Sequence, residues 1–377
     1  MPRRIALVVA LIGLLLVAGL RSRPVLAIPI FAHQYGVTCE KCHSVIPHLN
    51  AFGAAFMASG YRIPGVKPGP AFPISAKTNL VASTENQGDG LPKDVVDEIE
   101  TFTAGAIGER ASYLVEQYVV DGGTPGLTRD AWVIDRVNPW NARIPVFAQA
   151  GSFTLPVPVD PETFRDSYQG YAVMEQTVGS NPFNFFDPKI GVRASVGDAT
   201  RGLSGQLFVG QGHDRQSGIP SYGNDWMGVA QDTLGLVTLT GYRYSGTRPL
   251  GAGIDQFARS GFAVVYNDFS RWEWDNLIQT GWDSNCNVPF HVGCASSGGL
   301  TQLRYMFDRR LYAEARYEGT NAPSLAPGPG SPNGGFYRDG LLMLGYGTGE
   351  NSRITLEDVI SNAAPTHVWN LQFTLGI

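Results

Sequence analysis

The chain has 377 residues, a formal net charge of -5 and only 16% charged residues, whereas soluble domains typically carry about 25%. It has no basic stretch of the kind that binds nucleic acid, so we expect no nucleic-acid partner. Glycine (46 residues) and aromatic residues (11%) are abundant. This composition favours a β-rich protein whose outer surface does not all face water, although a soluble β-sandwich would have a similar composition.

Residues 1–27 have the pattern of a secretory signal peptide. Arg3 and Arg4 precede an apolar run from Ile5 to Leu20, and a small-residue cleavage site follows at residues 25–27. The alternative is a membrane anchor, but the run is shorter than the ~20 residues that a spanning helix needs. We therefore expect an exported protein.

A C-x-x-C-H motif, CEKCH at residues 39–43, lies in a distinct N-terminal unit at residues 28–70. At this spacing two thiols reach the two vinyl positions of one haem, and the adjacent imidazole binds its iron. The motif therefore predicts one covalent haem c on Cys39 and Cys42, with His43 as an axial ligand, and electron transfer as the function. A redox dithiol or half of a zinc site would use the same cysteines, but the context and further ligands that these need are missing.

The second axial ligand is open. Met57 is a candidate, although it lies in an apolar stretch with helical spacing, where core packing is the competing interpretation. His33 precedes the motif and could reach over the haem, whereas His48 follows His43 so closely that folding back would be strained.

The N-terminal unit is too small to fold by itself without an additional source of stability. A covalently bound haem would be one such source, and packing against the rest of the chain would be another. The Pro- and Gly-rich stretch from Pro64 to Pro73 is a short, stiff linker. We therefore expect the unit to dock against the remaining residues, 71–377.

Residues 71–377 alternate strand-like segments with turns. In the last segment, Trp369, Leu371 and Phe373 alternate with polar residues, and in residues 310–318 an apolar set alternates with a charged one. Such period-two patterns in about ten-residue segments are typical of outer-membrane barrels. Strands are expected at 72–84, 98–109, 113–119, 131–138, 143–154, 189–197, 203–211, 232–245, 256–269, 271–282, 300–308, 310–318, 336–348, 352–361 and 369–377, with one more in 163–178.

The fold class predicted is thus an all-β outer-membrane barrel of about sixteen antiparallel strands, with a small helical monohaem unit before it. A secreted sandwich or propeller is the alternative. Aromatic residues near strand ends suit the two interfacial girdles of a barrel: Tyr242, Tyr244, Trp272, Trp274, Trp282 and Trp369.

A second cysteine pair, Cys286 and Cys294, brackets a turn-rich segment. Because export permits disulfides, we expect these two to close a short extracellular loop. A metal site with His291 is the rival interpretation, but it has too few ligands for a closed site.

The N-terminal unit resembles the outer-membrane fused monohaem cytochrome–porins, whose best-known members oxidise ferrous iron at the cell surface. The resemblance covers about residues 28–63 and rests on Pro29, Phe31-Ala32, Gln34, Gly36, CEKCH, Pro47, Leu49-Asn50, Phe52-Gly53, Phe56 and Ser59-Gly60-Tyr61. It implies a barrel of about sixteen strands with the cytochrome unit held in or under its lumen. The family's haem-binding residues match Cys39, Cys42 and His43.

The function expected is electron transfer across the bacterial outer membrane. Extracellular Fe(II) would be the donor and a soluble periplasmic cytochrome the acceptor, which would make the chain an Fe(II):cytochrome oxidoreductase without catalytic side chains. The alternatives are a solute porin whose haem unit is a plug or sensor, and a soluble periplasmic cytochrome with a β-sandwich partner domain.

Overall fold

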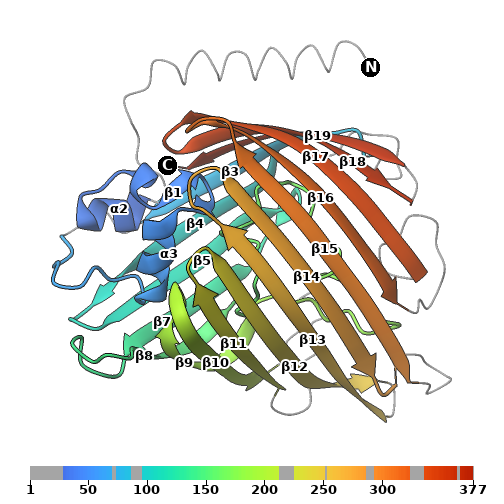
Figure 1. Ribbon diagram of the computed structural model, residues 1–377, viewed down its shortest axis with the longest axis horizontal. Coiled ribbons are helices and arrows are strands. Elements are labelled where there is room, and N and C mark those ends of the chain that lie inside the picture. The colour runs from blue at the N-terminus through green and yellow to red at the C-terminus, as the bar shows by residue number, and fades with distance from the viewer. Residues whose placement is uncertain are drawn as a thin grey trace.

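The computed structural model describes residues 29–69, 74–85, 96–211, 225–250, 253–285, 293–322, 335–362 and 366–376. Its main feature is a closed barrel of antiparallel strands (Figure 1). The expected signal peptide, residues 1–27, lies outside the described residues. Among the residues described, no helix is long and apolar enough to cross a membrane.

The elements follow one another in a simple order. The N-terminal unit contains α2 (Pro29–Tyr35), the 3-10 helix η1 (Cys39–Lys41), β1 (His43–Val45), β2 (His48–Leu49) and α3 (Ala51–Ala58). The barrel strands are β3 (Ser75–Ser83), β4 (Val96–Ile107), β5 (Ala111–Asp121), β6 (Thr124–Pro125), β7 (Thr128–Arg136), β8 (Val146–Phe153), β9 (Lys189–Asp198), β10 (Arg201–Gln211), β11 (Asp225–Leu234), β12 (Val237–Leu250), β13 (Gly253–Asn267), β14 (Trp272–Asp283), β15 (Cys294–Met306), β16 (Leu311–Ala322), β17 (Gly335–Gly349), β18 (Ser352–Ser361) and β19 (His367–Gly376).

The last strand, β19, pairs with the first, β3, and closes the barrel. Because β6 has only two residues and lies in the connection from β5 to β7, sixteen full strands form the wall within the described part of the chain. The predicted strand number is confirmed, and the alternative of a soluble sandwich is wrong. Closure leaves no unpaired sheet edge, which is the condition for a sheet to cross a membrane.

One expected strand is misplaced. Residues 163–178 form no strand, and the sixteenth strand is instead β11. The expected strand 232–245 runs through a tight turn at Gly235, where φ is +67°, and so merges the end of β11 with β12. Apolar residues continue on both sides of this turn, so the sequence pattern conceals it.

Burial in the barrel is inverted relative to a soluble protein. In β19 the Trp369 side chain is 48% exposed, whereas its neighbour Asn370 is 2% exposed. In β16, Tyr317 is likewise exposed and Glu318 is fully buried. Polar residues therefore line the lumen and apolar residues cover the outer wall, as in barrels that contact lipid.

The aromatic girdle is confirmed in part. Trp272, Trp274 and Trp282 are each about half exposed on the outer wall. Tyr242 and Tyr244 were expected there but face the lumen, where both are buried. Each places its hydroxyl on an inner-wall acceptor: Tyr242 donates to Gln279 (2.8 Å), and Tyr244 donates to Asp225.

A long connection between β8 and β9, residues 154–188, folds into the lumen. We call it the inner loop. The carboxylate of Glu357 on β18 accepts hydrogen bonds from the backbone amides of Tyr168 (2.9 Å) and Gln169 (3.0 Å). Farther along, Gln279 on β14 donates to the Val173 carbonyl (2.8 Å). The inner loop is thus held from several sides, and it shares one apolar core with the inner wall: Phe153, Leu155, Val157, Val159, Tyr171, Val173, Met174, Phe183, Phe185, Phe186, Phe208, Tyr242, Tyr244 and Phe257 among others.

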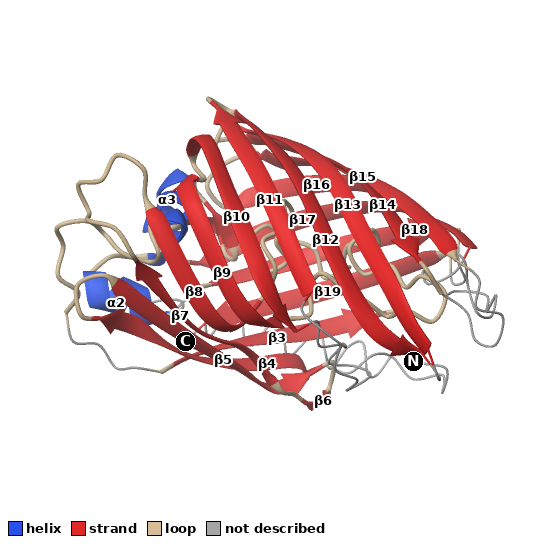
Figure 2. Ribbon diagram, turned by 90° about the horizontal axis from the view of Figure 1, so that it is seen from below, coloured by secondary structure: helices blue, strands red, loops and turns tan. Residues whose placement is uncertain are grey.

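The N-terminal unit lies at one end of the barrel (Figure 2). This is the end with the short turns, because Arg62 donates to the carbonyls of Gly108 and Glu109 (both 3.0 Å) in the turn between β4 and β5. Val45 packs on the inner wall near the turns before β16 and after β17. The expected docking of this unit is therefore present.

An aromatic cluster forms the main contact between the unit and the wall. Phe31 stacks on Tyr61 with ring centroids 5.3 Å apart, and Phe56 meets the same tyrosine edge-on at 5.9 Å. Tyr61 in turn contacts Trp132 of β7 at 5.2 Å. Gly60, with φ +71°, comes so close to Phe147 of β8 that an added Cβ would lie 2.9 Å from its ring.

Cys294 is disulfide-bonded. Its expected partner, Cys286, lies outside the described residues, so the pairing of these two stays a prediction.

We predict that Arg62→Ala loosens the docked unit, because it removes the charged donors that bind the carbonyls of Gly108 and Glu109. A hydrogen bond to a charged group contributes ~1.5–3 kcal/mol, so docking should weaken by about 2–4 kcal/mol. Hydrogen exchange of residues 29–69 in the full chain measures this, with the exposed Lys67→Ala as the matched control. Unchanged exchange in Arg62→Ala would show that the contact does not hold the unit in place.

Candidate functional site

The C-x-x-C-H motif forms a single tight turn. Its backbone closes through a hydrogen bond from the Cys42 amide to the Cys39 carbonyl (3.0 Å). Cys39 is buried, and Cys42 is partly exposed. Burial raises the pKa of the Cys42 thiol, with Cys39 adding to the effect. A redox dithiol needs the opposite, a stabilised thiolate, so this environment disfavours that alternative.

Helix α3 is fixed against the turn by Asn50 and Gly53. The side chain of Asn50 caps the helix by accepting from the Gly53 amide (3.0 Å), and its backbone amide donates to the Cys42 carbonyl (2.9 Å). A Cβ at position 53 would lie 2.1 Å from that same carbonyl oxygen. Only glycine fits so close an approach, so Gly53 sets the distance between α3 and the motif.

The protonation state of His43 suits a metal ligand. Its Nδ1 lies 2.9 Å from the Pro47 carbonyl oxygen, which can only accept a hydrogen bond, so Nδ1 carries the proton. Burial lowers the pKa of His43 to about 4, although the bond to Pro47 acts in the other direction. The imidazole is therefore neutral at ordinary pH, with its Nε2 lone pair free of a proton, which is the tautomer that binds a metal.

The donor set thus fits a c-type haem. Two thiols lie on one turn, and the adjacent histidine is held in the ligating tautomer. In the described part of the chain, neither Cys39 nor Cys42 belongs to a group of three or more neighbouring His, Cys, Asp or Glu side chains that could hold a metal ion. The half-zinc interpretation therefore gains no support.

The three candidates for the second axial ligand are in different environments. His33 is exposed on α2. His48 is buried, with Nε2 2.9 Å from the Glu273 carboxylate and Nδ1 3.8 Å from Asp166, so both of its nitrogens face lumen acids. Met57 on α3 lines a cavity. His48 is thus engaged by other groups, and the choice between His33 and Met57 stays open.

The cavity has a volume of about 320 Å³ and lies between α3 and the inner wall. Its walls are largely apolar, with Leu49, Met57 and Tyr61 contributed by the N-terminal unit and Trp132 and Phe147 by the wall. Cys39, Cys42 and His43 do not line it, so the cavity does not enclose the motif. Polar groups, including Asp130, Asp160 and Glu162, line another part.

Sequence reasoning missed the residues that anchor His48. Glu273 lies on β14, and Asp166 lies in the inner loop, where Arg304 of β15 and Arg353 of β18 (3.0 Å) bind its carboxylate. No spacing in the sequence links these residues. The alternation of charged residues within single strands was the only available signal, and it indicates a polar lumen without indicating pairs.

No protein-family model and no curated protein sequence matches the chain, but solved outer-membrane porins do. A Salmonella typhi OmpF complex with daunomycin matches with a TM-score of 0.59 at 12% identity, covering 81% of this chain and 97% of that one. An anion-selective porin from Comamonas acidovorans matches with a TM-score of 0.57 at 9% identity, covering 81% and 98%.

The chain has the porin fold. This likeness, together with the apolar outer wall, bears out the expected location in the bacterial outer membrane, in contact with its lipid. At such low identity the likeness extends to the fold alone.

We predict that the Cys39→Ala/Cys42→Ala double variant carries no covalently bound haem, since both thioether bonds are lost. A haem stain on a denaturing gel measures this. The matched control is Cys286→Ser/Cys294→Ser, which should stain like the wild-type protein. A stained band for the first variant would refute attachment at this motif.

Proposed function

We propose that this chain transfers electrons across the outer membrane through one covalent haem c. Residues 28–70 would form a monohaem cytochrome unit, after a signal peptide at 1–27 and before the barrel at 71–377. The observation that carries the proposal is the C-x-x-C-H turn, with His43 in its ligating tautomer, in a unit docked at one end of a closed barrel. When bound, the haem supplies a one-electron couple at its iron.

The residues of this chain would bind and orient that group. Cys39 and Cys42 would hold it covalently, and the Pro47 carbonyl would keep the His43 ring turned toward the iron. Met57 would supply a further ligand. Docking through Arg62 and the Tyr61 cluster would keep the unit from swinging away from the wall.

The position of the unit suggests the direction of transfer. In bacterial barrels the short turns face the periplasm, so the unit would meet a periplasmic partner, for which we propose a soluble cytochrome. The donor would be extracellular, with Fe(II) as the leading candidate on the resemblance to the iron-oxidising cytochrome–porins. The chain would then act as an Fe(II):cytochrome oxidoreductase.

The second candidate is a solute porin with the unit as plug or sensor. Likeness to solved porins favours it, as does the cavity between α3 and the wall. The occupied lumen argues against it. Buried aromatic side chains of the inner loop, such as Phe183 and Phe185, fill space that an open pore would leave to water.

The test uses full-length protein in liposomes that enclose an oxidised soluble c-type cytochrome. Adding Fe(II) outside should reduce the enclosed cytochrome in the wild type, because the haem-loaded protein would conduct electrons to it. The Cys39→Ala/Cys42→Ala variant should leave it oxidised. Equal rates in both would contradict the proposal, and so would no reduction in a wild type that holds its haem.

A further inference from the structure

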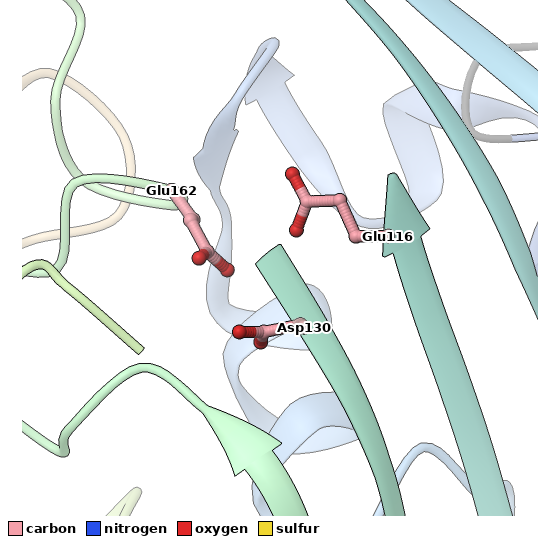
Figure 3. A group of neighbouring side chains, drawn as sticks. All are labelled: Glu116, Asp130 and Glu162. Carbon is pink, nitrogen blue, oxygen red and sulfur yellow. The ribbon is translucent and has the colours of Figure 1, made fainter. Parts of the chain in front are cut away.

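Three carboxylates from separate parts of the chain converge on the inner wall. Glu116 lies on β5, Asp130 on β7 and Glu162 in the inner loop, and one oxygen of each lies within 4.8 Å of the others. Figure 3 shows the three groups pointing toward one another. Glu116 is 4% exposed and Asp130 is 5% exposed. Because the three carboxylates are so close and two of them are buried, they repel one another strongly when ionised unless a positive charge lies between them.

The neighbouring groups satisfy only part of this cluster. Glu162 uses one oxygen, Oε1, to accept from Arg129 (3.2 Å) and Thr154 (2.9 Å). Asp130 uses Oδ2 to accept from the Trp132 ring nitrogen (3.2 Å). Its other oxygen, Oδ1, is buried and has no hydrogen-bond partner among the described residues. A buried carboxylate oxygen without a donor is costly, and here it belongs to a side chain aimed at two other carboxylates.

We propose that Glu116, Asp130 and Glu162 bind one divalent cation. Hard divalent cations take carboxylate oxygens at about 2.0–2.6 Å, which places oxygens on opposite sides of the ion about 4–5 Å apart. The observed spacing fits that range with little movement. The ion supplies the missing partner of Asp130 Oδ1 and offsets the repulsion among the three acids.

Two further charged groups tune the site. Arg129 offsets part of the negative charge and competes with the ion for Glu162. Asp160, in the inner loop, lines the same cavity as Asp130 and Glu162.

The site connects three parts of the molecule. The ion joins the inner loop to the barrel wall at β5 and β7. Through Asp130 and Trp132 the site is one hydrogen bond and one ring contact from Tyr61 in the N-terminal unit. The cavity that Asp130 and Glu162 line also extends to Gly235, in the turn between β11 and β12, and to Asn267 at the end of β13, so it reaches toward the short-turn end.

The test is Mn(II) binding to the purified full-length protein in detergent, followed by electron paramagnetic resonance of the free ion. The wild type should bind one Mn(II) per chain. Glu116→Gln and Asp130→Asn should each weaken binding at least tenfold, whereas Arg129→Gln should strengthen it. Glu314→Gln is the matched control, because Glu314 is a buried inner-wall glutamate outside the cluster.

Heat-modifiable gel migration reports whether each variant folds, and the wild-type titration decides the question even if a variant does not. No stoichiometric binding by the wild type, or equal binding by Glu116→Gln and Glu314→Gln, would overturn the site. Because Mn(II) binding needs no electron transfer, its failure would leave the proposed function standing. Loss of haem-dependent reduction would likewise leave the cation site standing.

Discussion

The structure depends on one constraint, the satisfaction of every backbone hydrogen-bonding group in a wall that faces lipid. Pairing of β19 with β3 meets it by closing the sheet. Closure then places alternate side chains inside and outside, so the apolar set covers the outer wall and the polar set is confined to the lumen. A lumen lined with Glu318, Arg316 and Asp339 must in turn be neutralised or hydrated.

Two inserted segments meet that second requirement. The inner loop presents backbone amides to Glu357 and Glu318 and a carboxylate to Arg304 and Arg353. The N-terminal unit adds His48, which lies against Glu273. Docking stabilises the N-terminal unit in return, because so few residues cannot bury enough apolar surface to fold without a partner. The same contacts therefore give the small N-terminal unit a fixed position.

The features that could be predicted from the sequence are those that depend on residues close together in the chain. Alternation in β16 and β19 gave the strand faces correctly, because period-two pleating needs no knowledge of distant residues. The C-x-x-C-H spacing predicts an attachment turn for the same reason, and the structure adds the Pro47 carbonyl as the partner of His43. The turn at Gly235 escaped detection because apolar residues continue through it, and the missing strand was sought in the inner loop.

Long-range contacts were beyond such reasoning. Tyr242 and Tyr244 look like girdle residues until the lumen is known to hold an apolar core. His48 looked like a possible iron ligand, yet its partners Glu273 and Asp166 are distant in sequence. The cluster of Glu116, Asp130 and Glu162 has no sequence signature either, since only barrel closure and the folding of the inner loop bring its members together.

The central claim is that electrons, not solutes, pass through this barrel. Conductance of the full-length, haem-loaded protein in a planar lipid bilayer tests it most directly. Because the inner loop and the docked unit fill the lumen, we expect insertion of the protein to produce no open-channel current steps. Stable steps of the size that open porins give would contradict the account and would favour the solute channel.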